Sequence, residues 1–571
     1  MVARSRLLSR SGAATAAVAA LVVVAALVVQ VSGPNQAAHF ALVRALADGT
    51  AEIDPRETID ASYVDGRFYA AKAPGLALFT LPWYGALRAI GLQDGSLASE
   101  TEYRDRLWEL GLFGSVLPFA VLLVLVVLTV DRLAVGWGPP TAVLLGGGTL
   151  LLPFATLFFD HVLATALGYG AFATLLLARD GPSSLRRIAL AGLLAGFAIV
   201  VEFPLALVAL VVGLYACVGS DRVRRLAVYA MGLLAGLVPL FAYNTWAFGS
   251  PVRLSYTNAL EAELSGGEPI VGANDEGFYG VGLPEPRSAL SLLVSEKGLA
   301  VVTPVALVAL AGLPLLWRAG RRAEALGCGA VPALFLAYNA AYYLPFGGQG
   351  PGPRFLVAAL PFLALPLACA LRARPLVVAG VGIASTVVMA LATLTDPLTG
   401  VEYGIGTWLG RLRDGDLVES VPSRLGLGSV AGAIVVAGLV LLAVAGALAR
   451  VPLGSSLRRD VPLLAGAVSA WLVLVAAAPD LLPADAENGT VEGTVAAAAL
   501  LACLVAGLGL ALRYGATALL PLVPTAILAL PQLDARPRVS LLVVVCALAV
   551  AAAVWWRLER VAQSADSSSQ G

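Results

Sequence analysis

Apolar segments long enough to cross a lipid bilayer recur along the whole of this chain. A helix needs about 20 mostly apolar residues to cross ~30 Å of hydrocarbon. Seventeen such runs lie near residues 14–32, 74–91, 107–130, 140–159, 162–178, 188–201, 203–219, 226–248, 299–317, 325–344, 355–371, 375–394, 430–449, 461–478, 494–512, 515–530 and 539–556. Only 13% of the 571 residues are charged, against about 25% in a soluble domain. The sequence therefore predicts an all-α polytopic membrane protein.

Arginine-rich connectors predict the topology, because Lys and Arg gather in the cytoplasmic loops of membrane proteins. Clusters occur at Arg179/Arg186/Arg187, Arg222/Arg224/Arg225, Arg318/Arg321/Arg322, Arg372/Arg374, Arg450/Arg458/Arg459 and Arg557/Arg560. All of them share the side of the N-terminal arginines only if the run 74–91, which contains Pro82 and Arg88, does not cross. We interpret that run as an interfacial helix. We expect about 16 transmembrane helices in the plasma membrane, with both termini cytoplasmic and the hydrophilic segments 33–106, 249–298 and 395–429 outside.

Composition and missing motifs narrow the function. The 37 basic and 37 acidic residues leave no net charge to attract nucleic acid. The five cysteines all lie in apolar runs, where we interpret them as small buried hydrophobes. The sequence contains no P-loop, Rossmann fingerprint or zinc-protease motif, and no domain large enough for a nucleotide sugar. A transferase on the outer face would instead use a sugar carried by a membrane lipid.

The first outer segment concentrates groups that can do acid–base chemistry. Asp54, Asp60 and Asp65 lie close to Tyr69 and Lys72 in the sequence. A carboxylate can accept a proton from an acceptor hydroxyl. Lysine can hold a phosphate leaving group, and tyrosine can donate a hydrogen bond to it. The alternative is an ordinary solvated loop.

Two histidines and a glutamate form a second set of candidates. His39 and His161 are the only histidines, and His161 directly follows Asp160 at the predicted mouth of a span. Asp160 and His161 are candidate ligands of a divalent metal or a means of orienting a base, while a simple helix cap is the alternative. Glu202 interrupts an apolar stretch, where it is either functional or solvated at a turn.

A glycine-rich turn supplies a third candidate. The segment Phe346-Gly-Gly-Gln-Gly-Pro-Gly-Pro-Arg354-Phe355 ends in an arginine at a predicted helix start. Backbone N–H groups and an arginine there suit a phosphate, although a plain loop with a snorkelling arginine fits equally well. Lys297 ends the second outer segment at the membrane and is a further candidate phosphate ligand.

Together these features resemble the GT-C superfamily of membrane glycosyltransferases, the clan of protein O-mannosyltransferases and bacterial aminoarabinose transferases. The resemblance rests on the stretch from Pro34 to Gly49, on Tyr69 to Pro74, on Asp160 and on Gly350 to Phe355. It implies a GT-C-like fold with surface helices in a large first extracytoplasmic loop. It also implies a polyprenyl-phosphate sugar donor whose phosphate meets Lys72.

The resemblance covers about residues 14–375, so we take 1–375 as the catalytic module, 376–562 as additional helices and 563–571 as a disordered tail. The family has an acidic pair where this chain has Asn35-Gln36, and an amide cannot accept a proton. We therefore expect Asp60 to be the base, with Asp54 and His39 as alternatives.

The predicted function is transfer of a sugar from a polyprenyl-phosphate donor to an extracytoplasmic acceptor, namely a cell-envelope glycan, a lipid or a protein. No cofactor beyond the candidate metal is expected. A transporter or flippase of lipid-linked saccharides is one alternative, but the predicted spans carry almost no charge near their middle. A catalytically inactive relative that acts as a scaffold is the other, because of Asn35-Gln36.

Overall fold

The computed structural model describes residues 2–54, 56–93, 99–179, 184–261, 270–272, 274–398, 404–454 and 457–481. These residues are mainly helical, with three short pairs of antiparallel strands. The predicted runs 494–512, 515–530 and 539–556 and the predicted tail lie outside the described residues.

Apolar helices form most of the described chain and follow the predicted runs. They are α1 (Val2–Leu27), α5 (Leu117–Leu133), α8 (His161–Ala178), α9 (Leu185–Val201), α10 (Ala206–Ala216), α11 (Arg222–Phe248), α16 (Arg322–Ala341), α17 (Ala364–Ala373), α18 (Pro375–Leu394), α20 (Ser429–Leu448) and α21 (Leu457–Leu481). Within the described ranges, seven helices are long and apolar enough to cross a membrane, or eight if one bent pair is a single span. The structure therefore supports a polytopic helical protein, while it does not reproduce the predicted number of spans.

Two of the predicted spans are broken helices. Run 140–159 forms α6 (Gly138–Gly147) and α7 (Leu151–Ala155), and its break coincides with three consecutive glycines. Run 299–317 forms α13 (Leu299–Val302), α14 (Pro304–Leu310) and α15 (Leu313–Arg318), with a bend of 98° before α14. Proline cannot donate a backbone hydrogen bond, so Pro304 favours a break at that point.

Packing between α9 and α11 depends on glycines four residues apart on both helices. A Cβ at Gly192 or Gly196 of α9 would lie 2.1–2.2 Å from carbonyl oxygens of α11, and one at Gly232 or Gly236 would lie 2.1–2.3 Å from those of α9. Small residues at this spacing let the backbones of membrane helices approach closely. The two helices therefore meet backbone to backbone, with no side chain between them at these four positions.

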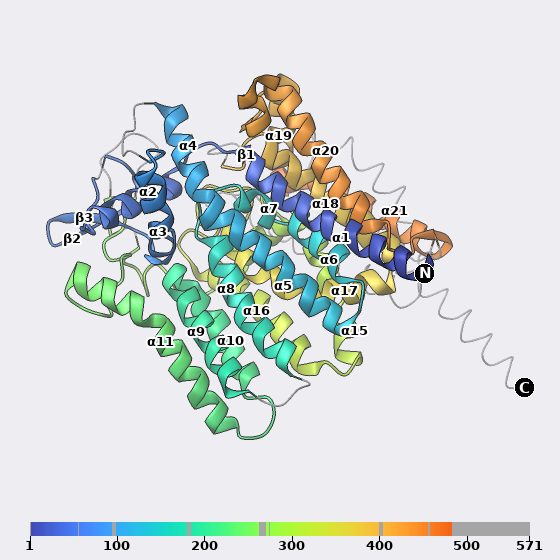
Figure 1. Cartoon of the computed structure of the whole chain (residues 1–571), viewed down its shortest axis with the longest axis horizontal. Helices are drawn as coiled ribbons and strands as arrows, with labels where there is room; N and C mark the ends of the chain where they lie inside the picture. Colours follow the sequence, from blue (N-terminus) through green and yellow to red (C-terminus); the bar gives the residue numbers. More distant parts are fainter. Residues whose placement is uncertain are drawn as a thin grey trace, which may run out of the picture.

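The first outer segment contains the predicted surface helices and also a hairpin that was not predicted. Its helices are α2 (Pro34–Ala47), α3 (Gly75–Ala89) and α4 (Glu100–Gly111), and its strands are β2 (Ala61–Val64) and β3 (Arg67–Ala70). Asp65 and Gly66 have φ angles of 51° and 84°, as a two-residue hairpin turn requires. Figure 1 shows α2, α3 and the hairpin gathered at one side of the molecule, away from α15 and α17.

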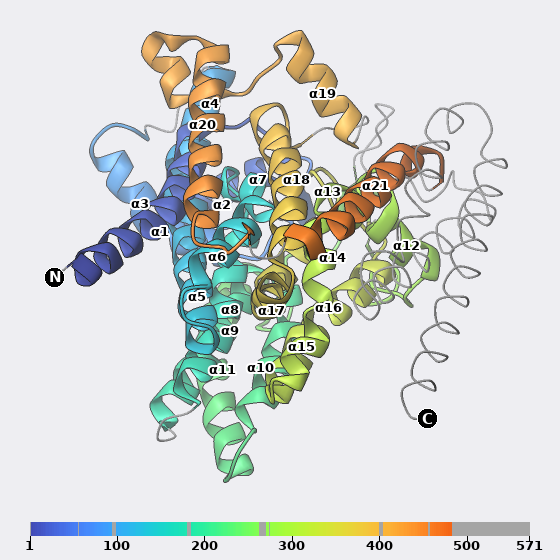
Figure 2. The same ribbon diagram turned by 90° about the vertical axis from the view of Figure 1, so that its right-hand side faces the viewer.

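α4 continues through the π-helical turn η1 (Leu112–Val116) into α5, so that one helix of 34 residues runs from Glu100 to Leu133. The other two outer segments add β4 (Leu260–Glu261), β5 (Ile270–Val271), α12 (Pro286–Val294), α19 (Gly404–Asp414), β6 (Glu419–Ser420) and η4 (Ser423–Leu427). Strand β1 (Val28–Val29), at the end of α1, pairs with β6. Figure 2 shows α4 and α19 at one end and α10 and α15 toward the other.

Candidate active site

A cavity of about 300 Å³ gathers residues from four separate parts of the chain. The residues that line it are Pro34, Asn35, Ile59, Asp60, Ala71, Lys72, Asp160, His161, Tyr256, Ala259, Leu260, Asn274, Tyr342, Tyr343, Leu344, Gly347, Gly348, Gln349, Arg354 and Phe355. Five of the predicted site residues are among them: Asp60, Lys72, Asp160, His161 and Arg354.

The cavity lies at the end of the helices that is opposite the arginine clusters. α8 begins at His161, which lines the cavity, and is followed by Arg179. α16 begins at Arg322 and ends next to Tyr342, which also lines the cavity. The cavity and the arginines therefore lie at opposite ends of the same helices, as the predicted topology requires of a site outside the membrane.

Asp60 and Lys72 form an ion pair beside the hairpin. Lys72 Nζ lies 2.8 Å from Asp60 Oδ2, and the Asp60 side chain is 33% exposed, whereas Lys72 is buried. The amide of Ala71 donates to the carbonyl of Asp60, which extends the β2–β3 ladder and brings the two segments together. Ser255 Oγ donates to the carbonyl oxygen of Lys72 at 2.6 Å, so the second outer segment also holds this lysine.

The electrostatic surroundings keep Asp60 ionised. Burial by itself raises the pKa of the Asp60 carboxyl, but attraction to Lys72 and Arg354 outweighs burial and lowers the pKa below its ordinary value. Asp60 is therefore an anion at neutral pH and can act as a proton acceptor.

Gly75 fixes the position of the segment that carries Lys72. A Cβ at Gly75 would lie 2.5 Å from the backbone of Val201. The first turn of α3 thus packs directly on the last residue of α9, next to Glu202. This close approach explains why a glycine stands at position 75.

Arg354 is placed by the glycine-rich turn before it. It begins the 3-10 helix η3 (Arg354–Leu363), and its guanidinium lies 5.4 Å from the centre of the Phe355 ring. A Cβ at Gly347 would lie 2.7 Å from Arg354 Nε, and φ at Gly347 is +78°, which favours glycine. The buried Nε has no hydrogen-bond partner within the described ranges. The turn therefore leaves room for an arginine that faces the cavity.

Asp160, His161 and Glu202 meet at the buried side of the cavity. His161 Nδ1 lies 3.1 Å from Glu202 Oε1 and 3.4 Å from Asp160 Oδ1, and all three side chains are at least 95% buried. His39 Nε2 approaches the other oxygen of Asp160 at 3.5 Å. Both histidines of the chain thus contact the same carboxylate.

The geometry of this cluster excludes two interpretations considered above, namely Asp160 as a helix cap and Glu202 as a solvated residue at a turn. The Asp160 side chain makes no capping hydrogen bond to α8, so it is not a helix cap. Glu202 is buried and not solvated, because α3 packs against the end of α9. Burial raises the pKa of Glu202, whereas for Asp160 the attraction of both histidines outweighs burial and lowers the pKa.

The remaining candidates do not line the cavity. Asp54 is paired with Arg56 and Asp65 with Arg253, both near the surface. Tyr69 is buried with its ring 4.9 Å from that of Phe248. None of these three residues therefore faces the site.

Two further candidates are buried close to the site without lining it. Lys297 lies with its ammonium 5.5 Å from the centre of the Phe346 ring, and its side chain is buried. His39 is fully buried behind Asp160. Neither is therefore placed to contact a substrate in this cavity.

Several lining residues were not predicted from the sequence. Tyr256 packs edge-on against Phe203, and Asn274 donates to the Tyr256 carbonyl at 2.7 Å. Tyr342 packs against Phe355. The pair Tyr342-Tyr343 before the glycine-rich turn was a detectable signal, whereas nothing in the sequence marks Tyr256.

The neighbouring amides Asn35 and Gln36 have different surroundings. Asn35 lines the cavity, and its buried Oδ1 has no hydrogen-bond partner among the described residues. Gln36 Oε1 accepts from the backbone of Phe158, so this side chain holds the loop before α8. Of the pair, Asn35 is therefore the one placed to meet a substrate.

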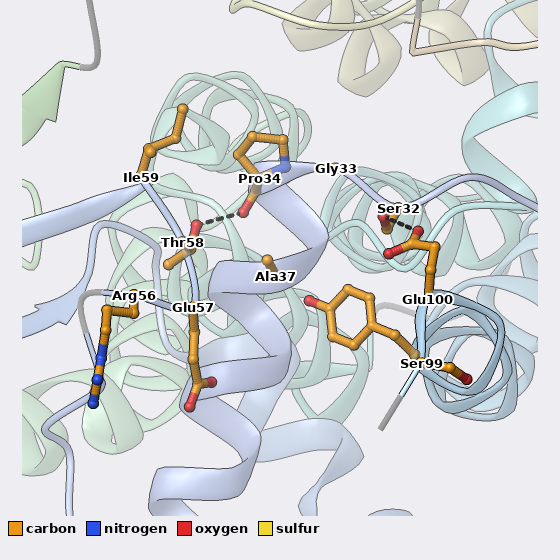
Figure 3. Close-up of a pocket in the computed structure, with 11 residues that line it drawn as sticks. Ser32, Gly33, Pro34, Ala37, Arg56, Glu57, Thr58, Ile59, Ser99 and Glu100 are labelled. Atoms are coloured by element: carbon orange, nitrogen blue, oxygen red, sulfur yellow. Dashed lines mark hydrogen bonds between the residues drawn. The ribbon is translucent and has the colours of Figure 1, made fainter. Parts of the chain in front are cut away.

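A second, larger cavity of about 770 Å³ adjoins the first and shares Pro34 and Ile59 with it. Figure 3 shows Glu57 and Thr58 on one side of it and Ser32 and Glu100 on the other, with the first turn of α2 between them. Its lining combines hydroxyl and carboxylate groups with the ring of Tyr103. Such a surface is suited to a polyhydroxylated molecule.

Two solved structures resemble this one in fold. They are ArnT from Cupriavidus metallidurans bound to undecaprenyl phosphate (14% identity, TM-score 0.45, 82% of this chain and 80% of that chain) and in the apo state (13%, 0.46, 83% and 81%). At these identities the likeness concerns the fold alone. No protein-family model and no curated protein matches the chain.

Proposed function

We propose that this protein transfers a sugar from a polyprenyl-phosphate donor to an acceptor on the outer side of the membrane. The observation that carries the proposal is the meeting of Asp60, Lys72 and Arg354 in one cavity at the ends of apolar helices. A carboxylate beside two cations suits a reaction in which one oxygen loses a proton while another becomes a phosphate anion.

The donor phosphate would lie between Lys72 and Arg354. An ammonium group has three N–H donors, so Lys72 can keep its bond to Asp60 and still donate to a phosphate oxygen. Arginine offers a planar fork that matches phosphate. As the bond from the anomeric carbon to the phosphate oxygen breaks, both cations stabilise the negative charge that develops on the leaving group.

Asp60 would act as the general base. It accepts the proton of the acceptor hydroxyl as that oxygen bonds to the anomeric carbon from the face opposite the phosphate, which gives inversion. Asn35 would accept a hydrogen bond from a substrate hydroxyl through its buried Oδ1. The acceptor would occupy the larger cavity, which meets the smaller one at Pro34 and Ile59.

The test is sugar transfer from radiolabelled polyprenyl-phosphate sugars by the purified protein in lipid. We expect Asp60→Asn and Lys72→Ala each to lower the rate by at least about 100-fold, the usual contribution of a general base or a charge-stabilising group. Glu52→Gln is the matched control, because Glu52 is a surface carboxylate of the same loop paired with Arg67. Asp54→Asn separates the two candidate bases, because it should leave the rate unchanged if Asp60 is the base.

Full activity of Lys72→Ala would reject the assignment of the phosphate site. No turnover of any donor by a folded wild-type protein would favour a scaffold or a transporter. In that case Asn35→Asp distinguishes the two, since a carboxylate restored at position 35 would give activity only to an inactive transferase.

A further inference from the structure

In the cluster behind the cavity, two of the three distances between candidate ligand atoms match those of a metal coordination shell. A first-row metal binds nitrogen and oxygen at about 2.0–2.2 Å, so neighbouring ligands in octahedral or tetrahedral sites lie about 3.0–3.5 Å apart. His161 Nδ1 lies 3.1 Å from Glu202 Oε1 and 3.4 Å from Asp160 Oδ1. The ligand atoms of the three residues all lie within 4.8 Å of one another.

These short contacts do not have the geometry of hydrogen bonds, and the same atoms have no other hydrogen-bond partner in the described part of the chain. Asp160 Oδ1, both ring nitrogens of His161 and both carboxylate oxygens of Glu202 are buried there without a hydrogen bond. Buried polar groups are nearly always satisfied, and burying two carboxylates without full compensation is costly. Lys72, an ammonium of the cavity lining, is engaged by Asp60. A cation bound among the three side chains would satisfy these atoms together.

We propose that Asp160, His161 and Glu202 bind a divalent first-row transition metal ion beside the candidate active site. One imidazole and two carboxylates suit Zn²⁺, Mn²⁺, Fe²⁺ or Co²⁺ better than Mg²⁺ or Ca²⁺, which prefer oxygen ligands alone. His39 contacts Oδ2 of Asp160, whereas His161 contacts Oδ1. His39 therefore has the position of a residue that orients a metal ligand.

The position of the three ligands leaves the metal accessible from one side. Asp160 and His161 line the cavity, whereas Glu202 lies behind them at the end of α9. Three protein ligands with the remaining coordination positions open toward a cavity are typical of metals that contact a substrate or water. The ion would therefore face the same space as Lys72 and Arg354.

The experiment measures metal binding directly, without sugar transfer. The full-length protein, with any affinity tag removed, is treated with a chelator, freed of it and titrated with Co²⁺ or Zn²⁺. We expect one ion per chain, a visible absorption band with Co²⁺, and a higher thermal unfolding temperature with either metal. Glu202→Gln and His161→Gln should weaken binding by at least about tenfold, because each removes a ligand.

Asp60→Asn is the matched control, because it removes one carboxylate from the same cavity without changing the cluster. It should bind the metal as the wild type does. Absence of binding by the wild type, or unchanged binding by Glu202→Gln, would overturn the inference. Size-exclusion elution of each variant establishes that it is folded. Metal binding without any sugar transfer would keep this inference and reject the proposed function, and transfer by a protein that binds no metal would do the reverse.

Discussion

At the scale of single residues, the candidate site depends on the charged groups that surround Asp60. Burial opposes ionisation of this carboxyl, while Lys72, Arg354 and His39 favour it, and the attraction prevails. The same lysine is proposed to hold the leaving group. In the proposed reaction, one ammonium would therefore both help to keep Asp60 ionised and stabilise the leaving phosphate.

The pH dependence of the transfer rate tests this arrangement. Because the folded pKa of Asp60 is lowered, the base stays deprotonated as pH falls, and we expect the rate to hold until the pH is below the ordinary aspartate range near 4. In Lys72→Met the attraction to Lys72 is lost and only that to Arg354 and His39 opposes burial, so the pKa of Asp60 should rise. The residual rate should then begin to fall at a higher pH than in the wild type. Initial rates of the wild type and of Lys72→Met between pH 3.5 and 8 measure the acidic limb of each profile. Identical acidic limbs would contradict the role given to Lys72.

Gly347 offers a second test at this scale. Gly347→Ala places a Cβ 2.7 Å from Arg354 Nε at a φ of +78°, so we expect Arg354 to move and donor use to fall about tenfold or more, at a cost of about 1–3 kcal/mol. Gly49→Ala is the matched control, because its φ is +80° and nothing in the described structure lies within 4 Å of the new Cβ. Equal rates for the two variants would show that the glycine serves only the turn.

At the scale of elements, the contact between α9 and α11 holds the end of α9, and so Glu202, in place. The glycines on each helix meet the backbone of the other, which leaves no space for a side chain. α3 then packs on Val201 through Gly75. A chain of close backbone contacts thus leads from α11 through α9 to the segment that carries Lys72.

A bulky residue in this interface should therefore destabilise the protein. We expect Gly232→Leu to cost at least about 1–3 kcal/mol, the usual penalty for overpacking, and to lower the thermal unfolding temperature in detergent. Gly438→Leu on α20 is the control, because a Cβ there meets no described atom within 4 Å. An unchanged unfolding temperature for Gly232→Leu would mean that the two helices separate at little cost.

At the scale of the whole molecule, the sequence predicted the helices well and the site in part. Apolar runs mark helices because lipid requires internal backbone hydrogen bonding. Asp60, Lys72, Asp160 and Arg354, which come from separate parts of the sequence, line one cavity. The burial of Glu202 was not predictable, because it depends on a contact between Gly75 and Val201, far apart in the sequence. The hairpin at Asp65-Gly66 was missed although its turn residues are typical.

The orientation of the molecule remains a prediction that labelling can test. Leu283, in the second outer segment, and Val223, at the start of α11, are both strongly exposed. In a background without the five native cysteines, Leu283→Cys should react with a membrane-impermeant maleimide in intact cells, and Val223→Cys only after permeabilisation. The reverse pattern would place the candidate site in the cytoplasm and exclude an outer-face transferase.

A hydrogen bond between the end of β1 and the end of α18 has a consequence for how the protein is made. Gln30, just after β1, donates to the carbonyl of Thr393, 363 residues further along the chain. At about 5–20 residues per second, synthesis takes roughly 20–70 s to supply that partner. The first loop, with Asp60 and Lys72, therefore lacks this contact while the later helices are synthesised. Quality control during biogenesis therefore has a long interval in which to act on a half-built site.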